Sequence, residues 1–139
     1  ILNIGLLTQR LVCASHWVGG EDEARHQRLG FLASGTCAAA ALVAAADLGR
    51  SIGAVVVESG RPDLAGGALR RVKCPVLLLV SQHDEELEDY NAEALELLDC
   101  PKELRRVPGR PPAGDDIAHL AADWFLEHLG HATSARFRR

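Results

Sequence analysis

Side chains that could carry out nucleophilic chemistry gather at two places in this sequence. The first is Ser34-Gly35-Thr36 with Cys37 beside it, which offers a hydroxyl and a thiol just before a predicted helix. The second is His83-Asp84-Glu85, where an imidazole is followed by two carboxylates. A serine or cysteine nucleophile needs a general base, and a histidine base needs an acid to orient it. Nucleophilic catalysis would therefore require the fold to bring the two segments together.

The hydrophobic pattern predicts which elements carry these segments. We expect strands over 28–33, 52–58, 75–81 and 102–107, a turn over 59–63, and helices over 4–18, 37–48, 89–98 and from Asp115 or Asp116 onward. Thr36 is expected to cap the second helix and Asp115 or Asp116 the last one, whereas 64–73 is too broken by Gly and Arg to predict a helix.

The strands are continuous apolar runs rather than alternating ones, which indicates a parallel sheet covered on both faces. The predicted fold class is α/β, with about four parallel strands and helices on both faces. In such a sheet the site lies at the carboxyl ends of the strands. Both Ser34-Gly35-Thr36 and Gln82-His83-Asp84-Glu85 follow a predicted strand, so both belong to that edge.

Composition limits the possible classes of protein. The 139 residues allow at most one domain. Hydrophobic residues make up 47% of the chain but aromatic residues only 4%, which favours α/β layers with a core of Leu, Val and Ala. The net charge of −4 argues against a nucleic-acid partner. The four cysteines form no Cys-x-x-Cys motif, and no apolar run is long enough to span a membrane. We therefore expect a cytoplasmic protein with reduced thiols and no membrane partner.

Residues 30–46 resemble the nucleophile elbow and following helix of dienelactone-hydrolase-like α/β-hydrolases, which have Gly-x-Ser-x-Gly followed by a run of alanines. The resemblance continues through 58–66, 72–80, Asp84-Glu85 with Asn91, and 120–125. It implies that residues 1–130 are equivalent to the second half of an α/β-hydrolase fold. Residues 131–139 would then form a basic, flexible tail.

Laid without gaps on the family motif, residues 33–37 place Gly35 at the nucleophile position. Glycine tolerates the strained backbone of an elbow, so Gly35 and Thr36 are expected to keep the shape of the turn without its nucleophile. The resemblance places Asp84 at the position of the acid that orients the catalytic histidine. Without that resemblance, an acid after a strand is more often a turn or cap residue.

The histidine of the family lies just after the last strand, following Val-Pro-Gly. This chain has Val107-Pro108-Gly109 and then no histidine, with Pro112 or a neighbour in its place. The oxyanion-hole segment of the family would fall before Ile1, so a fragment, a processed chain and an unusual start all remain open. The resemblance implies a truncated, catalytically inactive homologue. The alternative is part of an active ester or lactone hydrolase whose other half comes from missing sequence or a partner chain.

Two displaced nucleophiles remain as alternatives. Ser34 would require a one-residue slip of its strand, which inverts every side chain on that strand. Cys37 would require a shifted frame that places the thiol inside the first helical turn, and neither residue gains a matched histidine. His83 with the carboxylates at 84–86 could approach a metal, but no second ligand group supports this site. We therefore expect neither a metal nor a cofactor.

The first strand of this chain would be a central strand in the complete sheet. Alone, it becomes an exposed apolar edge, and such edges pair with other strands. We therefore expect a homodimer through this edge or a separately supplied amino-terminal half.

Overall fold

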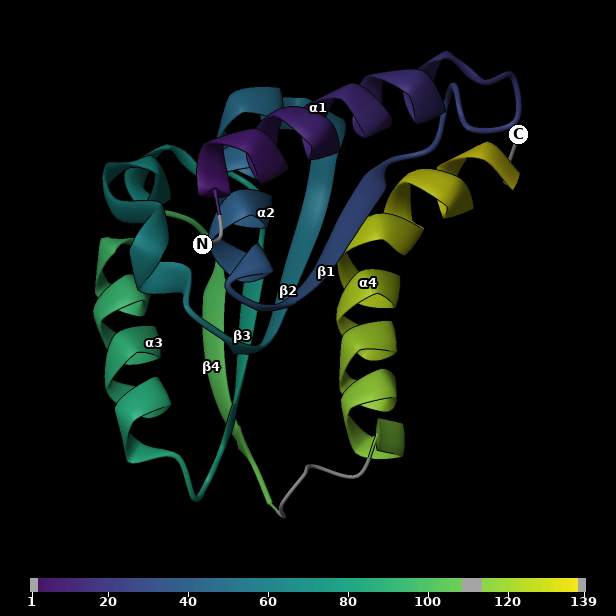
Figure 1. Ribbon diagram of the computed structural model, residues 1–139. Coiled ribbons are helices and arrows are strands. Elements are labelled where there is room, and N and C mark those ends of the chain that lie inside the picture. Colours follow the sequence, from purple (N-terminus) through teal and green to yellow (C-terminus); the bar gives the residue numbers. More distant parts are fainter. Residues whose placement is uncertain (1–2, 109–113, 138–139) are drawn as a thin grey trace.

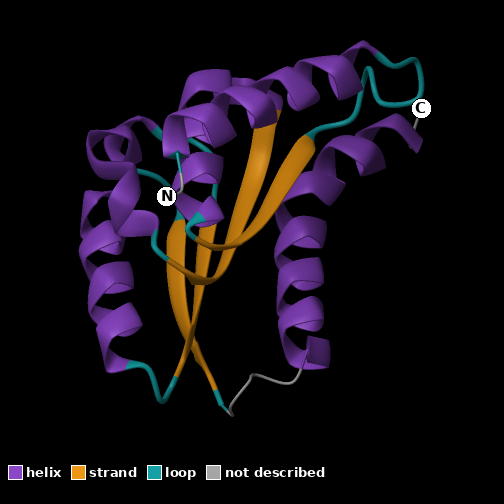
Figure 2. Ribbon diagram, in the orientation of Figure 1, coloured by secondary structure: helices purple, strands orange, loops and turns teal. Residues whose placement is uncertain are grey.

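Four parallel strands form one sheet in the order β1-β2-β3-β4, with helices on both faces (Figures 1 and 2). This computed structural model describes residues 3–108 and 114–137. The strands are β1 (Leu29–Gly35), β2 (Ile52–Gly60), β3 (Val76–Ser81) and β4 (Lys102–Val107); the α-helices are α1 (Ile4–Gly20), α2 (Cys37–Leu48), α3 (Glu85–Leu97) and α4 (Gly114–Phe137), and the 3-10 segments are η1 (Gly49–Ser51) and η2 (Pro62–Arg71). The predicted α/β class is confirmed.

The two central strands explain why the apolar runs in the sequence are continuous. Side chains of β2 and β3 point alternately to the two faces of the sheet, and both faces are covered, so Val55 to Val57 and Val76 to Leu78 are all fully buried. One face packs on α2, α3 and η2, and the other packs on α4, the helix on the right of Figure 1. The sheet therefore separates two hydrophobic cores.

Helix α2 lies close to the sheet because its buried side chains are small. Ala38 to Ala41 are at most 3% exposed. A Cβ added to Gly60 at the end of β2 would lie 2.6 Å from Cβ of Ala38 and 2.6 Å from Cγ1 of Val57. The backbone of β2 and the first turn of α2 can pack at this distance only if residue 60 has no side chain.

The second core is smaller and depends on α4. Trp124 is 6% exposed and packs with Ala121 against Ala54, Val56 and the other buried side chains on that face of β2 and β3. The helix continues to Phe137, past the point at 130 where the sequence suggested a flexible basic tail. It begins at Gly114, so Asp115 and Asp116, which we predicted as alternative caps, both lie inside it.

Four further details differ from the sequence prediction. Strand β2 extends through Ser59 and Gly60, which we had assigned to a turn. Segment η2 forms where no helix was predicted, kinked at Gly66, whose φ of +56° interrupts the helical backbone. Helix α3 begins at Glu85 rather than at 89, because the side chain of Asp84 caps it. Thr36 makes no side-chain cap hydrogen bond, since its backbone is already helical.

Strand β1 forms one edge of the sheet, as expected from the sequence. Its Leu32 side chain is 59% exposed, although it lies in the middle of the strand. In the part of the chain that the structure describes, none of the helices has the length and hydropathy needed to cross a bilayer.

The close approach at Gly60 gives a first prediction. Gly60→Ala should lower the free energy of unfolding by about 1–3 kcal/mol, because the new methyl group overlaps two side chains that cannot easily move. Urea unfolding followed by circular dichroism measures the change. The matched control is Gly67→Ala, where an added Cβ meets no atom within 4 Å, and its effect should stay within about 0.5 kcal/mol. Equal stability of the two variants would contradict this account of the packing.

Candidate functional site

The turn between β1 and α2 contains the residue that the sequence places at the nucleophile position. Gly35 has a φ of +58°, in the left-handed region that residues with a side chain rarely adopt. Its carbonyl oxygen accepts a hydrogen bond of 3.0 Å from the N–H of Arg61, which anchors the turn to the segment after β2. An added Cβ at Gly35 would meet no atom within 4 Å. The backbone is thus that of a sharp strand-to-helix turn that faces open space.

A bulge in β2 lies next to this turn. Ser34 pairs with Glu58 but Gly35 pairs with Gly60, so Ser59 is an extra residue in the ladder. Its φ of +45° is the only left-handed backbone at a non-glycine among the residues described. Bulges of this kind bend a strand and often occur next to active sites. The bulge could not be predicted from the sequence, because Ser59-Gly60 resembles an ordinary turn.

A charged and aromatic cluster, which was not predicted from the sequence either, lies beside the same turn. Arg61 donates two hydrogen bonds to Asp63, of 2.9 and 2.8 Å, and its guanidinium carbon lies 3.7 Å from the centre of the Tyr90 ring. Tyr90 in turn donates to Glu86 at 2.8 Å. The hydrogen bonds that Arg61 donates to Asp63 raise the pKa of Arg61, and the hydrogen bond that Tyr90 donates to Glu86 raises the pKa of Tyr90.

These contacts join η2 to α3 beside the carboxyl ends of the strands. The guanidinium of Arg61 is bound by Asp63 and stacked on Tyr90. The cluster therefore stabilises the packing of η2 on α3 and does not offer an unpaired cation to a ligand. The only sequence signal for the cluster was the Arg-Pro-Asp triplet at 61–63, directly after a strand.

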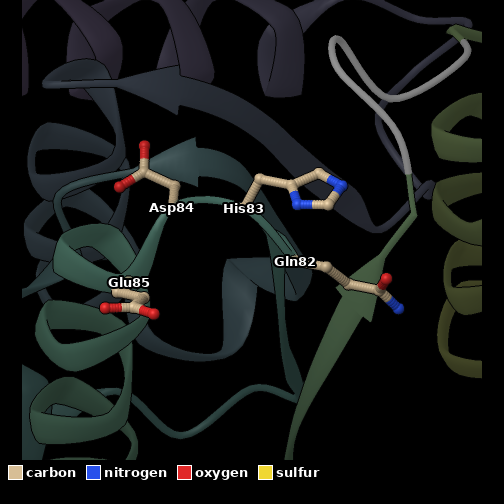
Figure 3. A pocket seen from close by; sticks show the side chains of 4 residues that line it. All are labelled: Gln82, His83, Asp84 and Glu85. Atoms are coloured by element: carbon tan, nitrogen blue, oxygen red, sulfur yellow. The ribbon is translucent and has the colours of Figure 1, made fainter.

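Asp84, the residue at the acid position, acts as a helix cap. Its Oδ1 accepts a hydrogen bond of 3.1 Å from the N–H of Leu87 in the first turn of α3. Gln82, His83, Asp84 and Glu85 line an open pocket of about 740 Å³. Figure 3 shows the imidazole of His83 and the carboxylate of Asp84 pointing to opposite sides. These neighbours in sequence therefore do not form the orienting pair that a catalytic triad needs.

The two displaced nucleophiles lie elsewhere. Ser34 and Cys37 both line a groove of about 500 Å³ between α1 and β1, together with Leu7, Leu11 and Phe31. None of the four residues around the Asp84 pocket lines this groove. Ser34 and Cys37 therefore line the same groove, whereas Asp84 lines a different pocket.

The loop that carries the histidine in the family, here 109–113 with Pro112, lies outside the described residues. Its sequence, Gly-Arg-Pro-Pro-Ala, contains no histidine. Among the residues in 3–108 and 114–137 that the structure describes, no group of three or more His, Cys, Asp or Glu side chains could hold a metal ion.

Comparison with solved structures finds a close structural match. The crystal structure of dienelactone hydrolase from Anabaena variabilis matches with a TM-score of 0.88 and 40% sequence identity. The match covers 91% of this chain and 62% of that protein. This chain has a dienelactone-hydrolase-like α/β-hydrolase fold. No protein-family model matches it.

Two curated relatives carry a different name. They are the proteins from two Mycobacterium tuberculosis strains (CDC 1551 / Oshkosh and H37Rv) named "Putative phosphoribosyl transferase", each 36% identical over 135 residues. The match covers 93% of this chain but 30% of each relative, so the chain spans less than a third of their length. Their name was given to the longer proteins. The segment that they share with this chain has, in this chain, the dienelactone-hydrolase-like fold.

The capping role of Asp84 gives a second prediction. Asp84→Ala should lower the free energy of unfolding by about 1 kcal/mol, because the N–H of Leu87 loses its acceptor. Asp84→Asn should stay close to the unmodified protein, since asparagine caps a helix about as well as aspartate. Chemical unfolding of both variants measures the difference. An equal loss in Asn and Ala would mean that the carboxylate charge, not the capping oxygen, stabilises α3.

Proposed function

We propose that this chain is a catalytically inactive homologue of dienelactone-hydrolase-like enzymes. The observation that carries the proposal is Gly35. Its backbone has the left-handed conformation of an elbow residue, in the turn from β1 to α2, and it has no side chain to act as a nucleophile. Hydrolysis of esters or lactones by such a fold needs that nucleophile and a histidine to activate it.

The distribution of histidines supports the same proposal. The sequence after Val107 has no histidine at the position expected for the base. His83, which adjoins the acid position, points away from Asp84 (Figure 3). A hydroxyl or thiol without a general base is a weak nucleophile at neutral pH, so neither Ser34 nor Cys37 gains activity by its place in the groove.

The alternative is part of an active ester or lactone hydrolase. The turn at Gly35 and the carboxylate of Asp84 favour it, since both match the family's site positions. More than a third of the Anabaena dienelactone hydrolase lies outside the match, so an oxyanion hole and a base would come from that part or from a partner chain. Ser34 or Cys37 would then be the nucleophile and Asp84 the acid.

The two edges of the sheet differ in a way that bears on partners. Strand β4 carries Lys102 and an ion pair between Glu103 and Arg105, and charged side chains discourage further pairing at an edge. Strand β1 has no charged side chain and exposes Leu32 beside the apolar groove of α1. We propose that β1 pairs with another strand of the same fold, which in a preparation of this chain alone is β1 of a second copy.

A third prediction tests inactivity. Release of p-nitrophenol from p-nitrophenyl acetate should be no faster with this chain than with buffer. Gly35→Ser should remain inactive as well, because it restores a hydroxyl but no base; its left-handed backbone would cost roughly 1–2 kcal/mol of stability. Turnover by the unmodified chain that disappears in Ser34→Ala or Cys37→Ala would instead support the active-hydrolase alternative.

A fourth prediction tests the edge. Light scattering should find a dimer for the unmodified chain and a monomer for Leu32→Lys, because a charge on β1 opposes strand pairing. Leu64→Lys is the matched control, since Leu64 is 43% exposed on η2, which packs against α2 and α3, and this variant should stay dimeric. A cooperatively folded monomer at all concentrations of the unmodified chain would rule the pairing out.

A further inference from the structure

Two cysteines stand at the same level of neighbouring strands. Cys74-Pro75 directly precedes β3, and Cys100-Pro101 directly precedes β4. The first paired residues of these parallel strands are Val76 and Lys102, each two positions after its cysteine. The N–H of Val76 donates to the carbonyl oxygen of Pro101 at 2.9 Å, which continues the ladder toward the cysteines. The register therefore sets Cys74 opposite Cys100.

Both thiols also lie on the same face of the sheet. Cys74 is 6% exposed and belongs to the core that includes Val76 and Leu78, while Cys100 is partly buried and packs against that same core. Burial, and then the nearby thiol of Cys100, raise the pKa of Cys74 to about 11. Burial also raises the pKa of Cys100. The two sulfurs thus share one apolar environment that disfavours their charged forms.

This placement suits a disulfide. Adjacent strands lie about 4.8 Å apart, and a disulfide accepts Cα atoms separated by roughly 4.4–6.8 Å. An uncharged disulfide also suits an apolar core better than a thiolate does. The other two cysteines, Cys13 on α1 and Cys37 on α2, are exposed and lie on different elements.

We propose that Cys74 and Cys100 form a reversible intramolecular disulfide, with a small disulfide such as oxidised glutathione as the oxidant. The Cys100 thiolate, the more exposed of the two, attacks one sulfur of the oxidant. Its sulfur–sulfur bond breaks, one glutathione thiolate leaves, and a mixed disulfide forms on Cys100. The Cys74 thiolate then attacks the Cys100 sulfur and expels the second glutathione. Two protein thiols are oxidised and one glutathione disulfide is reduced to two thiols.

The bond would close a loop that contains the whole of β3 and α3, including the Asp84 pocket. Closing a loop of this length restricts the unfolded chain more than the folded one. The oxidised protein should therefore melt at a higher temperature, by about 5–10 °C. The reaction should be slow at neutral pH, and its rate should rise about tenfold per pH unit below the thiol pKa values, as the thiolate fraction does.

The test uses the chain with Cys13→Ser and Cys37→Ser, which leaves only the proposed pair. The protein is incubated with a mixture of oxidised and reduced glutathione. Intact-mass spectrometry should then find a single chain that is lighter than the reduced chain by two hydrogens. Proteolysis should yield one peptide pair joined through Cys74 and Cys100, which dithiothreitol separates. The melting temperature before and after oxidation completes the measurement.

The matched control adds Cys74→Ala to the same background. It should stop at the glutathione adduct on Cys100, because the second thiol is gone. The proposal is overturned if the two-cysteine protein also stops at that adduct, or if both thiols are still alkylated under denaturing conditions after prolonged oxidation. Disulfides found only between molecules, as dimers on a non-reducing gel, would overturn it as well.

Discussion

Ala38 and Gly60 approach so closely that one added carbon on Gly60 would lie 2.6 Å from the Cβ of Ala38. This contact fixes the first turn of α2 against the end of β2, and with it the path that the chain must take out of β1. The hydrogen bond between the Arg61 N–H and the Gly35 carbonyl closes the same corner. The left-handed turn at Gly35 is therefore imposed by packing around it, and does not depend on a catalytic side chain at that position.

The polar residues around this corner have structural roles of their own. Asp84 caps α3, and Arg61 links Asp63 to Tyr90 across η2 and α3. Under the proposed function, these structural roles explain how the carboxyl ends of the strands keep a hydrolase-like arrangement without selection for hydrolytic activity. Geometry at a former site persists where the same atoms also hold helices and strands in place.

Much of the fold could be predicted from the sequence because its signals are local. β3 and β4 were placed within one residue, since Pro75 and Pro101 mark where each strand starts and the runs after them are short. The family motif also drew attention to Gly35, whose backbone is left-handed where β1 leads into α2. Ser59 was out of reach, because its backbone depends on a register shift against β1 that no local pattern records. The stacking of Arg61 on Tyr90 joins segments far apart in the chain. The apolar pattern predicted α3 only from 89, because its first turn, from Glu85, is mostly acidic.

The unequal covering of the sheet has a dynamic consequence. One face is held by several elements. Among the residues described, the apolar side chains that cover the other face come from α4, which is anchored by Trp124 (Figure 1). Lifting that single helix would bare Ala54, Val56 and their neighbours while the first core stays closed. Regions held by few apolar contacts open before the rest of a protein. In hydrogen exchange, α4 should therefore behave as a separate cooperative unit that opens below the energy of global unfolding, with the amides of β2 and β3 the last to exchange.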